Sequence, residues 1–338
     1  MEFRRRLKSD AFRVKEVSKE KEKSIVTNWS DHSGVFVGDV EAEAPKKISN
    51  DFGKYINFRS LTTGGKAELR VCKDTNLGRK VVIKSLRPEF KNDSQELKRL
   101  LREARITSQL QHPGTVPVYE IGTDFDGNYY FTMKKVEGLT LFQIIVRLSQ
   151  KDEYATKEYQ LDGLLNVLLQ VADTLAYAHA RGVIHRDIKP ENVLIGPFGE
   201  AVLLDWGVAK VWGMPNESSE DTIHDRGGTP LYMSPEQVLG NRMIDERTDI
   251  FSIGIVLYEM LALREPFRGA NVRATFDNIV NVVPKPPSER NPNRIIPAEL
   301  ERICLKALQK NPADRYQSIK QMSDEIRDFR NQAMQAMG

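Results

Sequence analysis

Short runs of alternating apolar and polar residues, separated by turn residues, fill the chain from Tyr55 to Leu86. The runs are YINFRSL, ELRVCKD and RKVVIKSL, and the turns between them are TTGG and TNLG. This period of two predicts three antiparallel strands in a meander. A helix is predicted from Ser94 to Leu110, and two more strands, in GTVPVYEIG and NYYFTMKK, are predicted around the turn DFDG.

After Gly138 the apolar spacing lengthens to three and four residues, which predicts helices. The longest helical stripe lies in LDGLLNVLLQVADTLAYAHARG. Further helices are predicted at about 249–262, 298–309 and 318–334. The pattern therefore predicts an α+β chain with a small, strand-rich lobe at 52–134, a connector at 135–138 and a larger, helical lobe at 139–334. A cleft between two such lobes is a natural ligand site.

The composition narrows the class of protein. Of 338 residues, 40% are hydrophobic and 29% charged, and the net charge of +3 gives no indication of nucleic-acid binding. Residues 1–24 hold nine Lys/Arg against five Asp/Glu, so residues 1–51 are predicted to be a basic, flexible extension, with a binding patch as the alternative. Cys72 and Cys304 fit no metal-ligand spacing, and with no signal peptide or apolar span they indicate a cytoplasmic chain.

The polar residues of the stretch VIHRDIKPENVLI lie in a tight loop between two short apolar runs. The loop holds Asp187, Lys189 and Asn192. An Asp and an Asn in one loop suit two tasks, orienting a hydroxyl and binding a hard cation through oxygen. Asp205 follows the next predicted strand, in LLDWG, so its carboxylate is expected in the same cleft. Asn192 and Asp205 are therefore predicted ligands of Mg²⁺, with Mn²⁺ as an alternative.

Lys84 lies in the third predicted strand directly after Ile83, so it faces away from that apolar neighbour and toward the cleft. Glu103 lies on the predicted helix, close to an apolar stripe. An acid in such a place is costly unless it is paired. Lys84 is the predicted partner, and the alternative is that Glu103 is a solvated acid in the charged run KRLLREAR.

The segments HRDIKPEN, DWG and GTPLYMSPE, in this order and spacing, resemble the eukaryotic-type (Hanks-type) protein kinase family. Three segments are most similar to the bacterial serine/threonine branch of this family. They are HRDIKPENVLI, TDIFSIGIVLYEML and NPADRYQS. The resemblance covers about residues 52–330. It implies a bilobal kinase fold that binds ATP between a β-rich N-lobe and a helical C-lobe.

Roles in the reaction follow from this resemblance. Asp187 would accept the proton of the substrate hydroxyl, and Lys189 would steady the transferring phosphoryl group. The pair of Lys84 and Glu103 would aim the lysine at the α- and β-phosphates. Thr229 would contact Asp187 and Lys189.

Other residues receive structural roles from the same resemblance. Glu236 and Arg315 resemble the buried ion pair that anchors the activation segment. Asp249 resembles the acid at a helix start that braces the catalytic loop. His185 is interpreted as a satisfied interior histidine, and Trp206, where the family usually has Phe, as a packing residue.

The nucleotide loop of the family has three glycines, which align with Thr62, Gly64 and Ala67. Only Gly64 remains, beside Gly65. A non-glycine residue forced into a left-handed conformation costs about 1–2 kcal/mol, or roughly tenfold in affinity. Because the charged groups are present, we expect the loop to tune the site without closing it. The loop residues expected around the phosphates are Thr62, Thr63, Gly64, Gly65, Lys66 and Ala67.

The resemblance also implies an apolar adenine pocket. Val82 replaces the family's usual alanine, which adds bulk above the ring. The backbone of Lys134 and Val136, in the connector, is expected at the adenine edge. The other positions that match the pocket are Leu61, Leu69, Met133 and Leu194.

The activation segment, 205–236, contains the polar stretch GMPNESSEDTIHDRGGTP. We expect activation by phosphorylation there, and the exposed hydroxyls are those of Ser218, Ser219 and Thr222. Arg186 would pair with the phosphate. The acidic residues of the same stretch are the alternative, since they could mimic that charge.

The sequence thus predicts a serine/threonine protein kinase that transfers the γ-phosphoryl group of ATP to proteins and phosphorylates a second copy of itself in trans, as a homodimer. A pseudokinase scaffold is one alternative, favoured by the altered loop. A small-molecule kinase is another, which GTPLYMSPE argues against because that segment docks a peptide. Bacterial relatives often carry a membrane span after the kinase domain, so an anchor beyond this chain is a further expectation.

Overall fold

The structure, a computed structural model, describes residues 50–63, 65–211, 228–241 and 243–335. Several predicted features therefore lie outside the described residues. They are Gly64, the candidate phosphorylation sites Ser218, Ser219 and Thr222, and all but the last two residues of the predicted N-terminal extension.

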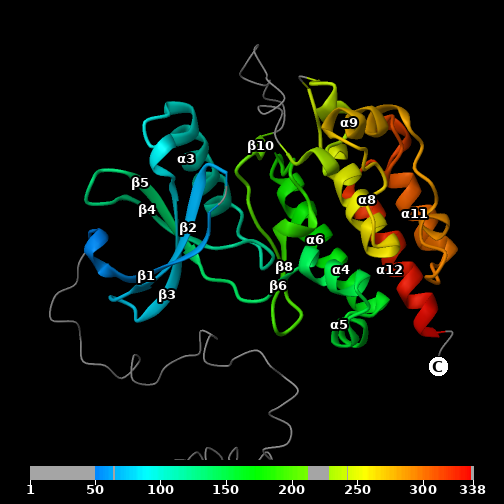
Figure 1. The fold of residues 1–338 in the computed structure, drawn as a ribbon, viewed down its shortest axis with the longest axis horizontal. Helices are drawn as coiled ribbons and strands as arrows, with labels where there is room; N and C mark the ends of the chain where they lie inside the picture. The colour runs from blue at the N-terminus through cyan, green and yellow to red at the C-terminus, as the bar shows by residue number, and fades with distance from the viewer. Residues whose placement is uncertain (1–49, 64, 212–227, 242, 336–338) are drawn as a thin grey trace, which may run out of the picture. The chain divides into compact units, whose positions relative to one another are not determined.

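The N-terminal sheet, β1 to β5, is antiparallel with the strand order β1-β2-β3-β5-β4 (Figure 1). Its strands are β1 Tyr55–Thr63, β2 Ala67–Asp74, β3 Arg79–Leu86, β4 Val118–Thr123 and β5 Tyr129–Lys134. The first three strands form the predicted meander. The β4–β5 hairpin then joins with β5 beside β3, and β4 begins after Pro117, later than the predicted strand did.

The two faces of this sheet carry different residues. One face holds an apolar cluster of Tyr55, Cys72, Val81, Ile83 and Tyr130, covered in part by the 3-10 helix η2 Phe52–Lys54. Helix α3 Ser94–Gln109 packs on the other face, where its Leu100 and Ala104 meet Leu86 and Phe131. Since Lys84 follows the fully buried Ile83, strand alternation points it to the α3 side, away from Ile83 as predicted.

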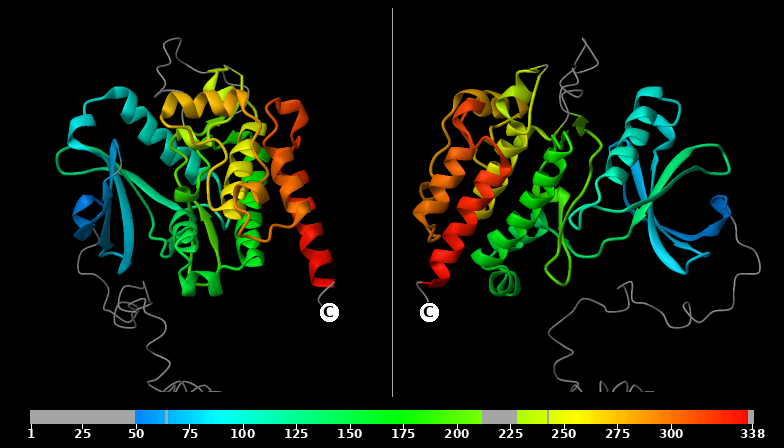
Figure 2. Two further views of the ribbon diagram at one scale, coloured as in Figure 1. Left: turned by 45° about the vertical axis from the view of Figure 1, so that its right-hand side comes forward. Right: turned by 180° about the vertical axis from the view of Figure 1, so that it is seen from behind.

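The rest of the chain is mainly helical (Figure 2). Its helices are α4 Leu141–Ser149, α5 Glu153–Glu158, α6 Leu161–Ala180, α7 Pro235–Val238, α8 Arg247–Ala262, α9 Val272–Asn281, α10 Pro287–Arg290, α11 Ala298–Ala307 and α12 Ile319–Gln335. The four helices that the sequence predicted here are confirmed as α6, α8, α11 and α12, with ends that shift by one or two residues. Helix α12 packs against α6 and α11 against α8. Helix α8 is buried at every position after Arg247, which explains why its sequence has no polar face.

Short strands at the start of this helical region position its loops. β6 Leu139–Thr140, β8 Val193–Ile195 and β9 Ala201–Leu203 form one small sheet, and β7 Val183–Ile184 pairs with β10 Lys210–Val211. The remaining 3-10 helices are η3 Pro88–Phe90, η4 Pro190–Asn192, η6 Pro230–Tyr232 and η7 Pro312–Asp314. At the end of the connector, Gly138 has φ +144, and a Cβ there would lie 2.0 Å from the carbonyl oxygen of Ile195. Only glycine fits at this position.

The described residues include no helix that is both long and apolar enough to cross a membrane. Cys72 and Cys304 are both buried and free.

Candidate active site

The hairpin of β8 and β9 brings two predicted metal ligands together. Asn192 directly precedes β8 and Asp205 follows shortly after β9, and Val193 pairs with Leu203 in the register. The backbone N–H of Leu204 donates to the carbonyl of Asn192 at 2.7 Å. Asn192 and Asp205 therefore lie at the same end of one hairpin, although the whole hairpin separates them in sequence.

The carboxylate of Asp187 accepts four hydrogen bonds. Its Oδ1 accepts from the N–H and the hydroxyl of Thr229, at 2.8 and 2.9 Å. Its Oδ2 accepts from Nζ of Lys189 at 2.7 Å and from Nδ2 of Asn192 at 3.3 Å. Nζ of Lys189 also donates to Oγ1 of Thr229 at 2.6 Å. The carboxylate is 8% exposed by residue and is held in one orientation by this network.

The chemistry of the two candidate metal ligands fits a hard cation. Nδ2 of Asn192 donates to the carbonyl and carboxylate of Asp187, so the amide oxygen is the atom left for a cation. The exposed carboxylate of Asp205 supplies further oxygen. No group of three or more His, Cys, Asp or Glu side chains in the described part of the chain could hold a metal. A cation here would thus depend on two protein oxygens plus phosphate and water, a set that suits Mg²⁺.

Two residues of this site have strained backbones. Arg186 has φ +70 and Asp205 has φ +61, a left-handed conformation that costs a non-glycine residue about 1–2 kcal/mol. The fully buried Asp249, in the first turn of α8, accepts the N–H groups of His185 and Arg186 at 2.8 and 2.9 Å. Nε2 of Gln237 donates to the carbonyl of Arg186 at 2.9 Å. These contacts hold the strained turn that precedes Asp187.

The charge on Asp249 is maintained despite burial. Burial acts to raise its pKa, but hydrogen bonds from Nε2 of His179 and from the backbone N–H of His185, both at 2.8 Å, hold the pKa of Asp249 below its usual range. The predicted bracing contact between this acid and the catalytic loop is therefore present in the structure.

Lys84 and Glu103 form the predicted ion pair. Nζ of Lys84 lies 2.6 and 2.7 Å from the two carboxylate oxygens of Glu103, and 3.5 Å from Oδ1 of Asp205. Burial acts to lower the pKa of Lys84, but the two carboxylates outweigh it and raise that pKa. Burial raises the pKa of Glu103 to about 7 against the opposing effect of Lys84. The Lys84 amine lowers the pKa of Asp205.

His185 and Trp206 are packing residues, as interpreted from the sequence. Their rings meet edge to face at 4.5 Å. Nδ1 of His185 accepts the N–H of Asp187 at 3.2 Å, so the proton lies on Nε2, which donates to the carbonyl of Leu204 at 3.1 Å. Burial lowers the pKa of His185, which keeps it neutral. The Trp206 side chain is buried, and its indole N–H has no acceptor among the described residues.

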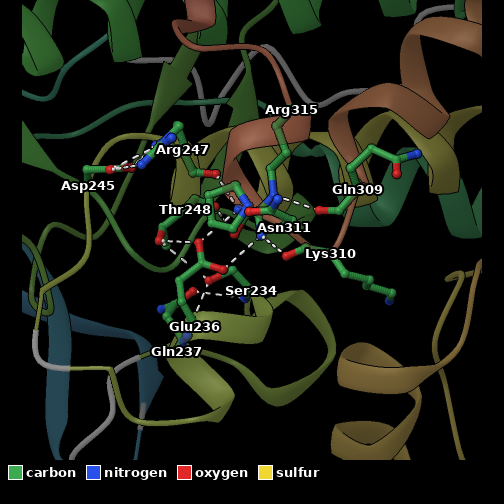
Figure 3. A network of polar contacts seen from close by, with 12 residues as sticks. Ser234, Glu236, Gln237, Asp245, Arg247, Thr248, Gln309, Lys310, Asn311 and Arg315 are labelled. Carbon is green, nitrogen blue, oxygen red and sulfur yellow. Dashed lines mark hydrogen bonds and ion pairs between the residues drawn. The ribbon is translucent and has the colours of Figure 1, made fainter.

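The predicted anchor between Glu236 and Arg315 is buried and fully hydrogen-bonded (Figure 3). The two terminal guanidinium nitrogens of Arg315 each donate to one oxygen of Glu236 at 2.8 Å. The other three N–H groups donate to backbone carbonyls, so all five donors are used. These carbonyls belong to Gln309, Lys310 and Arg247. Burial acts to raise the pKa of Glu236, but the bonds from Arg315 hold it below its usual range.

The predicted adenine positions of the sheet share one face with Lys84. Leu69 lies opposite Lys84 in the β2–β3 register, and Val82 lies opposite Met133. The backbone N–H of Lys134 donates to the carbonyl of Pro117 at 2.9 Å. Leu61 is 52% exposed. Leu194, on β8, is half-buried, and Val136 lies in the connector.

The loop between β1 and β2 differs from a simple glycine-rich turn. Thr62 and Thr63 belong to the end of β1, and Ala67 begins β2. A Cβ at Gly65 would meet nothing within 4 Å, so this glycine is not required by packing. The amine of Lys66 lies 2.7 Å from Oε1 of Glu96 on α3.

Sequence reasoning missed the neighbours of Arg186. The structure places Lys210, 4% exposed, close enough that burial and then the positive charges of Arg186 and Arg102 lower its pKa. The indication from the sequence was weak here, because Lys210 is simply the last residue of the short run GVAK. The group of three cations requires the β7–β10 pairing, which the sequence did not predict.

Comparison with known proteins gives the class of protein. Residues 55–325 match the model of the protein kinase domain family, and the chain belongs to this family.

Bacterial serine/threonine-protein kinases are among the proteins similar to this chain. Over 300 residues the chain is 35% identical to the serine/threonine-protein kinase PknD of Chlamydia trachomatis serovar L2b, covering 82% of this chain and 31% of that protein. The PknD of Protochlamydia amoebophila is 36% identical over 302 residues, covering 84% and 30%. The chain therefore spans about a third of the length of these relatives. Membership of the family implies use of ATP and a divalent metal ion.

Proposed function

We propose that this chain is a serine/threonine protein kinase that transfers the γ-phosphoryl group of ATP to hydroxyl groups of proteins. The observation that carries the proposal is the Asp187 network. One carboxylate faces Lys189, Asn192 and Thr229 at hydrogen-bond distance, and the hairpin end brings Asp205 to the same place. Family membership and the names of the bacterial relatives support the same reaction.

In this proposal each charged group has one task. Asp187 orients the substrate hydroxyl and takes its proton, and the contact it makes with Asn192 is the longest of its four and the easiest to exchange. Lys189 and Lys84 place positive charge beside the phosphates, and Glu103 keeps Lys84 in position. Asn192 and Asp205 would hold Mg²⁺, which neutralises phosphate charge when bound. The adenine would lie against the half-buried apolar positions on the inner face of the sheet.

Regulation is proposed at the activation segment. Burial and then the positive charges of Arg186 and Arg102 lower the pKa of Lys210 on β10, which indicates that positive charge gathers there. A phosphate on Ser218, Ser219 or Thr222 would find charge-assisted partners among these side chains. We propose that the chain adds this phosphate in trans, through a transient pair of copies. The 1–51 extension, the 52–134 and 139–334 lobes and the 135–138 hinge are proposed as its functional divisions.

The test is phosphoryl transfer from radiolabelled ATP to a generic basic protein, with mapping of modified sites. We expect phosphoryl transfer that requires a divalent metal ion. In Asp187→Asn the rate of transfer should fall by a factor of about 10²–10⁴, because general acid–base catalysis contributes that much. The unfolding temperature of Asp187→Asn is the control for folding. A wild-type chain that binds ATP but transfers no phosphate to any acceptor would favour the pseudokinase instead.

A further inference from the structure

The loop that has lost two family glycines is attached to helix α3 by a side chain. Nζ of Lys66 lies 2.7 Å from Oε1 of Glu96, which stands in the first turn of α3. Glu96 is 7% exposed and also accepts from Nη1 of Arg99 at 2.6 Å. The Lys66 amine is thus directed at the helix.

This contact runs parallel to the ion pair of Lys84 and Glu103. Glu96 and Glu103 belong to the same buried face of α3, and seven helical residues rise about 10.5 Å. The N–H of Arg87 donates to the carbonyl of Lys66 at 2.9 Å, so Lys66 lies beside Arg87, three residues past Lys84 on the neighbouring strand. Three strand residues rise about 10 Å. The two lysines are therefore spaced along the sheet as the two glutamates are along the helix.

The backbone of the loop is fastened at the same place. Nη1 of Arg87 donates to the carbonyl of Gly65 at 3.2 Å. Leu86, the residue before Arg87, packs against Leu100 and Ala104 of α3. A movement of the first turns of α3 would therefore also move Gly65 and Lys66, the loop residues that precede β2.

The Lys66 contact is expected to contribute little to folding. The Lys66 side chain is 47% exposed, and solvent screens an ion pair with such an exposed partner. Without Lys66, the carboxylate of Glu96 would still have Arg99 as its partner. Any effect of removing the Lys66 amine is therefore expected on the position of the loop more than on the stability of the fold.

We propose that Lys66 and Glu96 are positioning residues that fix the nucleotide loop to α3, so that the loop and Lys84 hold the phosphates as one unit. The inference rests on the proposed kinase function, because it assigns the loop to ATP. In this proposal the Lys66–Glu96 ion pair positions the loop, a task that glycine conformations serve elsewhere in the family. The ion pair would explain how the loop tolerates Thr62 and Ala67 in place of glycines.

The experiment measures the ATP dependence of phosphoryl transfer in Lys66→Met, Glu96→Gln and the double variant. We expect the KM for ATP to rise about three- to tenfold in each single variant and no further in the double variant, with kcat within twofold. Lys66→Arg should restore the wild-type KM. Lys320→Met is the matched control, because it removes a surface lysine that pairs with Asp324 on α12.

The alternative outcomes are distinct. A higher KM in Lys66→Met with an unchanged KM in Glu96→Gln would mean that Lys66 binds phosphate directly, and it overturns the proposal. An unchanged KM in both does the same. If the wild-type chain transfers no phosphate, the kinase proposal fails, and calorimetric Kd values for ATP then test the same cycle. A chain that binds no ATP overturns both.

Discussion

Two ion pairs of this chain, Arg315 with Glu236 and Lys84 with Glu103, are built differently. Arg315 and Glu236 are both buried, and every guanidinium N–H has an acceptor. Lys84 has two carboxylates within 3.5 Å, and the pKa of one of them, Glu103, is raised to about 7. The first pair has one arrangement only. The second has a surplus acceptor and a carboxylate that can become neutral, so it can change partners when a charged ligand arrives.

The largest effect on stability is expected at the buried pair of Arg315 and Glu236. Arg315→Met leaves the buried Glu236 without its cation, and removal of one partner from a buried pair costs about 3–5 kcal/mol. Urea unfolding measures this cost. The control is Arg302→Met, whose arginine is 49% exposed and pairs with Glu299 and Glu325, and about 1 kcal/mol or less is expected there. Equal losses in the two variants would contradict the difference between buried and exposed pairs.

Lys84→Met is expected to affect activity far more than stability. Loss of a charge-stabilising group beside the phosphates should lower kcat/KM by about 10²–10³. The unfolding free energy should fall much less than in Arg315→Met, because Glu103 can take up a proton when its partner is gone. Initial rates and urea unfolding of Lys84→Met and wild type at pH 6 and pH 8 test this. The loss of unfolding free energy should be smaller at pH 6 than at pH 8. A loss of 3 kcal/mol or more at pH 6 would show that Glu103 cannot be neutralised.

The two glutamates should give opposite pH dependences. The pKa of Glu103 is raised, so the folded chain binds its proton between about pH 4.5 and 7, and this group favours folding as pH falls through that range. Activity should decline over the same range, by about tenfold per unit below 7, since a neutral Glu103 no longer holds Lys84. The pKa of Glu236 is lowered, so its contribution to stability is present above about 4.5 and is lost at lower pH.

The pH profile of kcat/KM in wild type and Glu103→Gln separates these effects. Glu103→Gln should be less active and nearly independent of pH between 6 and 8. An unaltered decline below pH 7 in this variant would assign the titration to another group.

The smallest effect is expected at Trp206. Its buried indole N–H has no acceptor among the described residues, and an unsatisfied donor costs about 1–3 kcal/mol. Trp206→Phe removes that donor and also some packing, so the unfolding free energy should change by less than about 1 kcal/mol. Urea unfolding tests this value. A loss of about 3 kcal/mol or more, as for an ordinary large-to-small core change, would show that the indole is well satisfied.

The sequence predicted contacts well where burial left a charged residue with only one suitable partner. An acid on the apolar side of a helix required a cation, and Lys84 is that cation for Glu103. Local patterns also predicted the meander and the long helices. They did not predict that β5 lies beside β3, nor the helices α4, α5 and α9, because strand order and short helices depend on tertiary packing.

Contacts that depend on the assembled fold were missed for the same reason. Glu96 stands in the first turn of α3, and nothing in its neighbourhood in sequence indicates a lysine thirty residues earlier. Lys210 becomes a neighbour of Arg186 only through the β7–β10 pairing.

Through Asp249 in its first turn, helix α8 connects the core of the helical region to the turn that positions Asp187. Asp249 sets the direction of the strained turn before Asp187, and the rest of α8 is enclosed by core on every side. Substitutions deep in this helix, far from any ligand, would therefore alter catalytic rate by shifting one carboxylate. Inherited variation in the core could in this way adjust enzyme output while every residue of the site stays the same.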